Sequence, residues 1–354
     1  MNVLILGAGS VGMTIAQMLQ GSGDYDVAVG DHDAQTLARL PAALPKVQID
    51  AADEAAVGQA LAGRQVVINA LPFSFVPPVA NAAKAAGVHY FDLTEDVACT
   101  RHVKALAAEA NTAFVPQSGL APGFIAIAAH DLAQRFERAT DLHMRVGALP
   151  VFPTNALKYN LTWCTESLIN EYCNPCEVIL DGIRREVLPL EGHEMFSLDG
   201  TTYEAFNTSG GLGTLCETLD GAIANVDYKT VRYPGHRDII KLLIHDLGLG
   251  RRRELLKEVF EAAVPVTVQD VVLIFVTATG LREGRLTQES LAKKIYSQDV
   301  GGVRRSAIQV TTAAGLCAMV DLLRAGVLPQ RGFVRQESVA LSTFLDNRFG
   351  KYYA

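Results

Sequence analysis

The first twelve residues constrain the fold more than any other part of the chain. They read Met-Asn-Val-Leu-Ile-Leu-Gly-Ala-Gly-Ser-Val-Gly, an apolar run followed at once by glycines in the spacing Gly-x-Gly-x-x-Gly. The apolar run predicts a buried strand over residues 3–6, and Ile15 and Leu19, four positions apart, predict a helix directly after the glycines. A strand, a glycine turn and a helix in this order are typical of the phosphate-binding unit of dinucleotide-binding α/β domains.

The three glycines have separate roles in such a unit. Gly7 permits the tight turn, Gly9 lets the backbone approach a pyrophosphate, and Gly12 lets the helix pack close to the strand. The phosphates then lie on free backbone N–H groups at the helix start, near Ser10 and Val11, where the helix dipole favours negative charge. We therefore predict that these five residues bind a dinucleotide.

An acidic residue follows the second predicted strand, residues 26–30. Asp31 lies nineteen positions after Gly12, close to the spacing of about 20 residues expected for the carboxylate that binds the adenosine ribose hydroxyls. A carboxylate there repels a 2′-phosphate, and the next residue, His32, is not an arginine that would attract one. The sequence therefore predicts NAD as the cofactor, while Arg39, eight residues further on, keeps NADP open.

Strand and helix signals alternate as far as residue 116. Helices are predicted at 34–40, 54–61, 76–86 and 99–110, and strands at 47–49, 65–69, 89–93 and 113–116. This alternation predicts a doubly wound parallel (Rossmann) sheet of six strands. Ligands of such sheets lie beyond the carboxyl ends of the strands, which makes Asn69, Ala70 and Leu71 predicted cofactor contacts.

The pattern changes after residue 120. Pro122 and Gly123 directly precede a predicted helix over 124–136 whose free N-terminus can face a ligand, so both are predicted cofactor contacts. The later part of the chain has long strand-like runs separated by helical patterns: strands at 142–149, 177–189 and 270–279, and helices at 162–172, 237–247 and 252–262. An α+β domain with a mostly antiparallel sheet is therefore predicted for residues 121–303.

The overall prediction is an α/β protein of two domains. Residues 1–120 form the Rossmann domain, and residues 304–354, which begin with an amphipathic helix over 306–324, return to pack on it. A length of 354 residues suits two domains that each bury a core. The second, antiparallel sheet could pair edge to edge with a second copy, which predicts a homodimer from fold class alone.

Charge and composition bear on partners and location. A formal net charge of −7 gives the chain no general attraction to polyanions, so we expect no nucleic-acid partner. No basic and apolar leader precedes the strand at residue 2, and no apolar run of about 18 residues is seen, so we expect no membrane association and a cytoplasmic location. For six scattered cysteines in that location, reduced thiols are the expected state. Cys173 and Cys176 have the spacing of a zinc site or of a redox-active thiol pair, but the surrounding sequence lacks what either site needs.

Two polar clusters in the second half are candidate substrate contacts. Thr208, Ser209, Gly210 and Gly211 offer hydroxyls and exposed amides that suit a carboxylate, although an ordinary loop has the same composition. The second cluster is residues 228–236, Tyr-Lys-Thr-Val-Arg-Tyr-Pro-Gly-His. Each cluster therefore has a binding and a structural interpretation.

Alternation along a strand separates the residues of the second cluster. Tyr228, Thr230 and Arg232 would share one face, and Lys229 would lie on the other. Arg232 suits a bidentate contact with a carboxylate. A solvated strand edge is an equally good interpretation for Arg232 and His236, and the better one for Lys229.

A third cluster, Asp92, Thr94, Glu95 and Asp96, follows a strand of the Rossmann domain. Grouped carboxylates can raise the pKa of one member until it becomes a useful base, whereas a surface loop of acids is the structural alternative.

Four segments resemble the saccharopine dehydrogenase family, including its lysine 6-dehydrogenase branch: residues 119–123, 204–215, 228–236 and 347–350. The resemblance covers the whole chain. It implies a nicotinamide-dependent enzyme that oxidises the carbon–nitrogen bond at the ε position of lysine or of an N-substituted lysine, yielding allysine or its cyclised form.

The implied chemistry assigns a role to each cluster. The base, for which Asp92 is the first candidate and His236 the second, takes a proton from the substrate nitrogen as hydride leaves the ε-carbon for nicotinamide. The resulting imine is then hydrolysed. Arg232, Thr208 and Ser209 hold a carboxylate of the small amino-acid substrate and so align the ε-carbon.

Three functions remain in order of preference. Saccharopine, with three carboxylates, needs more cationic partners than lysine, with one, and Lys158, Arg184 and Arg237 are the available candidates. Saccharopine dehydrogenase is predicted first and lysine 6-dehydrogenase second. A non-catalytic NAD(H)-sensing regulator is the third, but it leaves the later polar clusters without a use.

Overall fold

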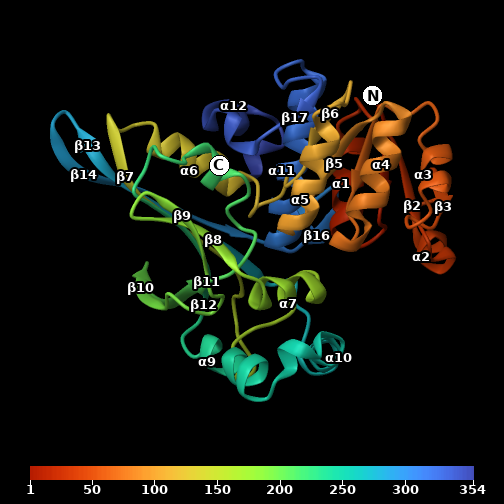
Figure 1. Ribbon diagram of the computed structural model, residues 1–354. Helices are drawn as coiled ribbons and strands as arrows, with labels where there is room; N and C mark the ends of the chain where they lie inside the picture. The colour runs from red at the N-terminus through yellow and green to blue at the C-terminus, as the bar shows by residue number, and fades with distance from the viewer. The chain divides into compact units, whose positions relative to one another are not determined.

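The computed structural model describes residues 1–354, which divide into two compact units (Figure 1). The first unit contains residues 1–124, 299–305 and 309–354, and the second contains residues 125–298 and 306–308. One unit is built on a parallel sheet and the other on a mixed sheet, as described below. The predicted α/β fold class is confirmed.

The first unit has a seven-stranded parallel sheet in the order β17-β6-β5-β4-β1-β2-β3. Its strands are β1 (Asn2–Leu6), β2 (Asp26–Asp31), β3 (Lys46–Gln48), β4 (Val66–Asn69), β5 (His89–Asp92), β6 (Ala113–Val115) and β17 (Gly332–Phe333). The chain runs outward from β1 to β3 and then returns to β4 on the other side of β1, so the strand order reverses between β1 and β4. Doubly wound sheets bind their ligands at this kind of switch point.

Helices connect these strands, as the alternation predicts. They are α1 (Ser10–Gly21), α2 (Ala34–Arg39), α3 (Glu54–Ala60), α4 (Val76–Ala86) and α5 (Val97–Ala107), with a short 3-10 turn η1 (Phe73–Phe75) before α4. All four residues of β4 are buried, which is typical of a central parallel strand covered on both faces. Three aspartates, Asp33, Asp53 and Asp96, cap helices α2, α3 and α5 by accepting hydrogen bonds from first-turn amides.

The C-terminal segment completes the first unit. After strands β15 (Gln298–Val300) and β16 (Val303–Arg305) it contains α11 (Ala307–Arg324), β17, η4 (Gln336–Ser338), α12 (Leu341–Asp346) and η5 (Gly350–Tyr353). The seventh strand, β17, pairs with β6 and was not predicted from the sequence. The ring of Tyr353 stacks on Phe124 with centroids 4.0 Å apart.

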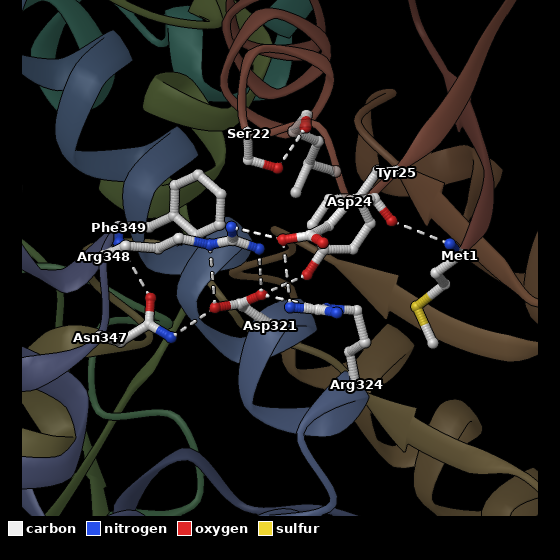
Figure 2. A network of polar contacts seen from close by, with 10 residues as sticks. Met1, Ser22, Asp24, Tyr25, Asp321, Arg324, Asn347, Arg348 and Phe349 are labelled. Atoms are coloured by element: carbon white, nitrogen blue, oxygen red, sulfur yellow. Dashed lines mark hydrogen bonds and ion pairs between the residues drawn. The ribbon is translucent and has the colours of Figure 1, made fainter.

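A polar network fixes this tail to the start of the Rossmann sheet (Figure 2). Asp321 of α11 accepts a hydrogen bond of 2.6 Å from the Tyr25 hydroxyl and bonds of 2.9 and 2.7 Å from Asn347 and Arg348. Arg348 also reaches Asp24, beside β2, at 2.6 Å. Residues more than 290 positions apart are thereby held together.

Helix α11 is the one helix long and apolar enough to span a membrane by length and composition, although no such run was expected from the sequence. Most of the helix is buried inside the protein. A core helix of a soluble protein passes the same test, so this observation is weak evidence for a membrane span.

The second unit has an eight-stranded mixed sheet with the main order β10-β11-β12-β7-β13-β14. Its strands are β7 (Arg138–Pro150), β8 (Cys176–Leu180), β9 (Ile183–Val187), β10 (Glu194–Leu198), β11 (Thr201–Asn207), β12 (Asn225–Arg232), β13 (Asp270–Arg282) and β14 (Arg285–Tyr296). The hairpin of β8 and β9 pairs with β12. Only β12 and β7 run parallel, so the predicted mostly antiparallel sheet is confirmed.

The second unit also contains several short helices. Alongside α6 (Phe124–Ala133), the unit contains α7 (Thr165–Cys173), α8 (Leu215–Thr218), α9 (His236–Lys241) and α10 (Arg253–Ala263). The helix predicted at 237–247 continues from α9 as the π-helical turn η2 (Leu242–Asp246), followed by η3 (Leu249–Arg251). Apolar residues of α7, α9 and α10 pack against Phe206 of β11, and together they form the core that surrounds the second-unit polar cluster described below.

Candidate functional site

The glycine turn of the first unit has the geometry that close backbone packing requires. Gly7 has a φ of +104°, and a Cβ atom there would lie 2.9 Å from the carbonyl oxygen of Ala70. A Cβ atom on Gly12 would lie 2.0 Å from the carbonyl oxygen of Gly7, so α1 can approach the turn only because Gly12 has no side chain. A Cβ atom on Gly9, by contrast, would meet nothing within 4 Å. The open side of the turn is therefore at Gly9.

The start of α1 is available to an anion. Gly9 is its N-cap residue, no side chain caps the helix, and the first turn contains no acidic residue. The first amides of a helix have no partner within the helix, and Ser10 and Val11 supply two of them. The dipole and these amides suit the diphosphate of a dinucleotide, so the residues present fit that cofactor.

Asp31 lies beside this turn. Its Oδ2 accepts a hydrogen bond of 2.8 Å from the amide of Ala8, and its Oδ1 accepts one of 3.0 Å from the amide of Asp33. On the other side, the carbonyl group of Ala70 faces Gly7, and Asn69 accepts a hydrogen bond of 3.2 Å from the amide of Leu71. The structure therefore brings the glycine turn together with Asp31 and with residues 69–71.

Pro122 and Gly123 belong to a separate turn of the first unit. Gly123 packs so closely on Gly119 that a Cβ atom would lie 2.1 Å from the Gly119 carbonyl oxygen, and Phe124 donates its amide to that oxygen at 3.0 Å. The turn directly precedes the main body of α6. A cofactor contact at Pro122 and Gly123 stays a prediction.

Asp92 is a buried carboxylate at the end of β5. Its Oδ1 accepts hydrogen bonds from the amides of Thr94 and Gln117, and its Oδ2 accepts one of 2.8 Å from the Tyr90 hydroxyl. Burial raises the pKa of Asp92 to about 6, although the hydrogen bonds from Gln117, Tyr90 and Thr94 lower it in part. Asp92 is thus ionised at neutral pH and close to the pKa range of a general base.

The other members of that cluster are not a surface loop of acids. Thr94 and Glu95 are buried, with exposed fractions of 5% and 7%, and Asp96 caps α5. The structural alternative considered for the cluster is therefore wrong. The loop turns inward because Asp92 accepts backbone amides from both of the segments that follow β5 and β6.

In the second unit, Arg232 and His236 are joined through Tyr172 of α7. The Nε of Arg232 donates to the Tyr172 hydroxyl at 3.1 Å, and that hydroxyl lies 3.0 Å from Nε2 of His236. Nδ1 of His236 lies 2.9 Å from the carbonyl oxygen of Leu157. Because a carbonyl oxygen can only accept, we assign the proton to Nδ1, and Nε2 therefore accepts from Tyr172.

These contacts argue against His236 as the base. It is completely buried, and burial together with the charge of Arg232 lowers its pKa to about 3. Both ring nitrogens are already hydrogen-bonded within the fold. His236 is a neutral positioning residue for Tyr172, and through Tyr172 for Arg232.

Arg232 is a buried cation with no carboxylate partner. Its side chain is bonded only to the Tyr172 hydroxyl and the Val231 carbonyl oxygen, and its guanidinium lies 4.9 Å from the ring centre of Tyr159. Only 3% of the residue is exposed, and the charges of Tyr172, Tyr159 and Glu171 favour its charged form against the effect of burial. The hydrogen bonds of this guanidinium go to a tyrosine hydroxyl and a backbone carbonyl oxygen, so its remaining donors suit the carboxylate of a ligand.

The loop of residues 208–211 joins the same place. It follows β11, and the amide of Ser209 donates to the carbonyl oxygen of Glu171, the neighbour of Tyr172 in α7, at 3.1 Å. The hydroxyl of Thr208 is buried and has no hydrogen-bond partner. Gly210 takes a φ of +85°, and Gly211 lies so close to the ring of Tyr228 that a Cβ atom would be 2.3 Å from it. The two clusters predicted from the sequence therefore meet at α7.

Sequence reasoning missed four residues of this cluster. Tyr172 and Glu171 lie in α7, Tyr159 packs beneath Arg232, and Glu204 of β11 accepts the amides of Gly235 and Arg237 at 2.9 and 2.7 Å. Glu204 thereby caps the start of α9, where His236 lies. Glu204 opens the polar and glycine-rich segment 204–215, so the sequence did contain a signal for it. Nothing in the sequence of α7 indicates that its polar residues are buried.

The other cations that the sequence offered as substrate contacts have partners within the protein. The prediction that Lys229 lies at a solvated strand edge is wrong. Lys229 is not at a solvated edge, because β12 is an inner strand and the Lys229 ammonium pairs with Glu194 at 3.0 Å. Of the extra cations considered for a tricarboxylate substrate, Arg184 pairs with Glu177, Arg237 with Glu191, and Lys158 donates to the Pro234 carbonyl oxygen. Arg232 is the one buried cation of the cluster without an acidic partner.

Cysteine and metal chemistry do not feature in this cluster. All six cysteines are free, and burial raises the pKa of both Cys173 and Cys176, which keeps them as thiols. No group of three or more metal-ligating side chains is arranged to hold an ion.

Comparison with known proteins covers both units. The family model described as the saccharopine dehydrogenase NADP binding domain matches residues 3–117, and the saccharopine dehydrogenase C-terminal domain matches residues 119–347. The chain is 24% identical over 263 residues to the saccharopine dehydrogenase [NADP(+), L-glutamate-forming] of Saccharomyces cerevisiae. That match covers 70% of this chain and 58% of the length of the yeast protein.

Solved structures show the same fold. The apo saccharopine dehydrogenase (L-Glu forming) from Saccharomyces cerevisiae has a TM-score of 0.76 at 18% identity, covering 95% of this chain and 94% of the yeast chain. An engineered D-amino acid dehydrogenase bound to NADP+ has a TM-score of 0.50 at 13% identity, covering 97% and 95%. Since the two family models together span nearly the whole chain, this protein belongs to the saccharopine dehydrogenase family of NAD(P)-dependent oxidoreductases.

Proposed function

We propose that this protein oxidises the carbon–nitrogen bond at the ε position of a lysine-type amino acid with NAD(P) as hydride acceptor. The observation that carries the proposal is Arg232, a buried guanidinium of the second unit whose hydrogen bonds go to the Tyr172 hydroxyl and the Val231 carbonyl oxygen rather than to a carboxylate. The family's yeast members are named saccharopine dehydrogenases, which supports saccharopine as the first substrate to test. The products would be allysine and glutamate.

The residues of each unit have distinct tasks in this proposal. The first unit holds the dinucleotide through the glycine turn and Asp31, and the nicotinamide supplies the hydride acceptor. Asp92 takes the proton from the substrate nitrogen, because it is ionised above pH 6 and desolvated. In the second unit Arg232 and the Thr208 hydroxyl bind a carboxylate, and alignment of the substrate supplies a large part of the rate.

L-Lysine is the second candidate, and a specific observation favours it. The three further cations that a tricarboxylate would need are engaged with protein carboxylates or carbonyl groups, which leaves Arg232 alone in the second-unit cluster. A substrate with one carboxylate matches one buried cation. The products would then be ammonia and allysine or its cyclised form.

One assay separates these functions. Purified protein is incubated with NAD or NADP and with either saccharopine or L-lysine, and absorbance of the reduced cofactor is followed. Reduction with saccharopine alone supports the first function, and reduction with L-lysine supports the second. Tight cofactor binding without reduction by either amine would instead support a nucleotide-sensing regulator.

A further inference from the structure

The second unit contains a pocket that the proposed reaction does not use. Its volume is about 470 Å³, and most of its lining residues come from the end of α7, the turns η2 and η3 and the first residue of α10. Helices α7 and α10 lie against each other in this part of the unit (Figure 1). A pocket of this volume can hold a small organic molecule.

The polar part of the pocket is basic. His245, Arg251 and Arg253 line it, and no aspartate or glutamate does. Arg253 is held in place, because its Nη1 and Nη2 atoms donate to the side-chain oxygens of Asn170 and Asn174 at 3.1 and 3.0 Å. A guanidinium has five N–H donors, so Arg253 keeps donors for a ligand. Two arginines in a lining without a carboxylate suit an anion.

A neighbouring cavity of about 630 Å³ lacks this excess of positive charge. It shares Arg251 and Arg253 with the pocket, but Arg252, Glu254 and Glu258 also line it. The two carboxylates there offset most of the charge of the arginines. An anion is therefore expected in the smaller pocket.

The rest of the smaller pocket is largely apolar. Tyr172, Pro189 and Ile244 line it, and Ile244 belongs to the π-helical turn η2. Turns of this kind are rare, and they frequently lie at functional sites. An anion with an apolar body would match both parts of the lining.

We propose that the pocket lined by Arg251 and Arg253 binds a phosphate monoester with an apolar organic body. Such a group carries a charge of about −1.5 to −2 at neutral pH, which matches two guanidinium groups better than the single charge of a monocarboxylate does. Arginine also binds phosphate through two parallel hydrogen bonds. The site goes beyond the proposed function, because neither arginine has a task in that reaction.

Tyr172 connects this pocket to Arg232, which makes the ligand an effector. Tyr172 lines the pocket, and its hydroxyl accepts the hydrogen bond of 3.1 Å from Arg232. The Arg232 guanidinium lies 4.9 Å from the ring centre of Tyr159, whose hydroxyl accepts a hydrogen bond of 3.1 Å from Trp163. Trp163 is the one tryptophan of the chain, so its fluorescence reports on this cluster.

The test is a calorimetric titration of the full-length protein with saturating NAD or NADP and no amine, so that the dinucleotide occupies the glycine turn and nothing is oxidised. Phenyl phosphate has both proposed features, inorganic phosphate lacks the apolar body, and benzoate has a single charge. We expect phenyl phosphate to bind roughly 10-fold more tightly than either of the others. Equal binding of the three probes, or no binding of phenyl phosphate, overturns the proposal.

Variants of two adjacent arginines locate the site. Arg251→Gln should weaken the binding of phenyl phosphate roughly 10-fold or more, and Arg251→Lys, which keeps the charge, should restore part of it. The matched control is Arg252→Gln, because it removes the same charge from a residue that does not line the pocket, and it should change the affinity by less than about twofold. Equal effects of Arg251→Gln and Arg252→Gln would overturn the site.

Fluorescence of Trp163 tests the connection to Arg232. Saturating phenyl phosphate should change the emission of the wild-type protein, and Tyr172→Phe, which removes the connecting hydroxyl, should reduce that change. Emission that stays constant at saturation would overturn the effector role.

These results are separable from those of the turnover assay. Binding of phenyl phosphate that depends on Arg251, without reduction of the cofactor by either amine, would refute the proposed reaction and leave the pocket standing. Reduction of the cofactor by a protein that does not bind phenyl phosphate would do the reverse.

Discussion

Asp31 and Asp92 end two parallel strands of the same sheet, yet their surroundings give them different tasks. Asp92 is buried and accepts three hydrogen bonds, and its pKa is raised to about 6. Asp31 keeps a partly exposed side chain beside the open glycine turn. One carboxylate is therefore suited to moving a proton, and the other to binding ribose hydroxyls.

The first prediction concerns the pH dependence of turnover. An acid with a raised pKa accepts a proton only in its ionised form, so kcat/KM for amine oxidation should rise with pH through about 6 and level off above it. Asp92→Asn should lower kcat by roughly 100-fold or more, remove this acidic limb, and leave the cofactor Kd within about twofold. Asp53→Asn, at a helix N-cap where asparagine is tolerated, is the control. Normal turnover in Asp92→Asn would rule out Asp92 as the base.

The second prediction concerns the choice between NAD and NADP. Asp31→Ser removes a negative charge beside the adenosine end of the cofactor, so the ratio of NADP to NAD affinity should rise by about 10-fold or more. Titration of cofactor fluorescence with both dinucleotides measures it. Asp33→Asn, which keeps a helix cap on α2, should leave the ratio unchanged. An unchanged ratio in Asp31→Ser would place the cofactor's ribose elsewhere.

At the scale of elements, two strand-to-helix junctions have the same arrangement: β1 to α1 and β12 to α9. In each, a strand ends in a tight turn and a helix begins with amides that need partners. The α1 amides are left uncapped for a ligand, whereas Glu204 satisfies those of α9 and so fixes His236. The free helix start is the binding one, and the capped one is structural.

The third prediction separates packing from binding in the glycine turn. Gly12→Ala should destabilise the protein by about 2 kcal/mol or more, because its methyl group would meet the Gly7 carbonyl oxygen at 2.0 Å. Gly9→Ala should change the free energy of unfolding by less than about 0.5 kcal/mol, since its methyl group meets nothing, but should weaken cofactor binding. Urea denaturation and cofactor titration measure the two effects. Equal destabilisation by both variants would contradict this account.

At the scale of the whole molecule, the C-terminal segment belongs to the fold of the first unit. It supplies the seventh strand and the network of Figure 2, in which four side chains share Asp321. Hydrogen bonds from Arg348, Tyr25 and Asn347 lower the pKa of Asp321 against the effect of burial. The tail is therefore a stabilising part of the sheet domain.

The fourth prediction tests this network. Asp321→Ala removes the shared acceptor and should lower the free energy of unfolding of the first unit by about 2 to 3 kcal/mol, because the remaining cations and hydroxyl lose their partner. Arg324→Gln, at a more exposed pair, should cost less than about 1 kcal/mol. Thermal unfolding of both variants against wild type measures the difference. An equal loss of unfolding free energy in the two variants would mean that solvent screens the interactions of Asp321.

Local patterns were sufficient for much of the first unit. The strand-turn-helix of residues 1–21 and the parallel alternation up to β6 follow from periodicity and turn chemistry, which act within a few residues. The position of β17 and the burial of Lys229 did not follow, because each depends on which segment lies beside it in a sheet. Register and neighbours are non-local properties.

The sequence by itself determined the α/β class, the dinucleotide turn and the identity of Arg232 as a candidate anion ligand, because spacing and residue type carry that information directly. Only the tertiary structure showed that Tyr172 links Arg232 to His236, that both ring nitrogens of His236 are engaged, and that the other candidate cations are engaged. The physical reason is burial. Whether a charged or polar group is paired, desolvated or left for a ligand depends on residues that are distant in the chain, and only folding brings them into contact.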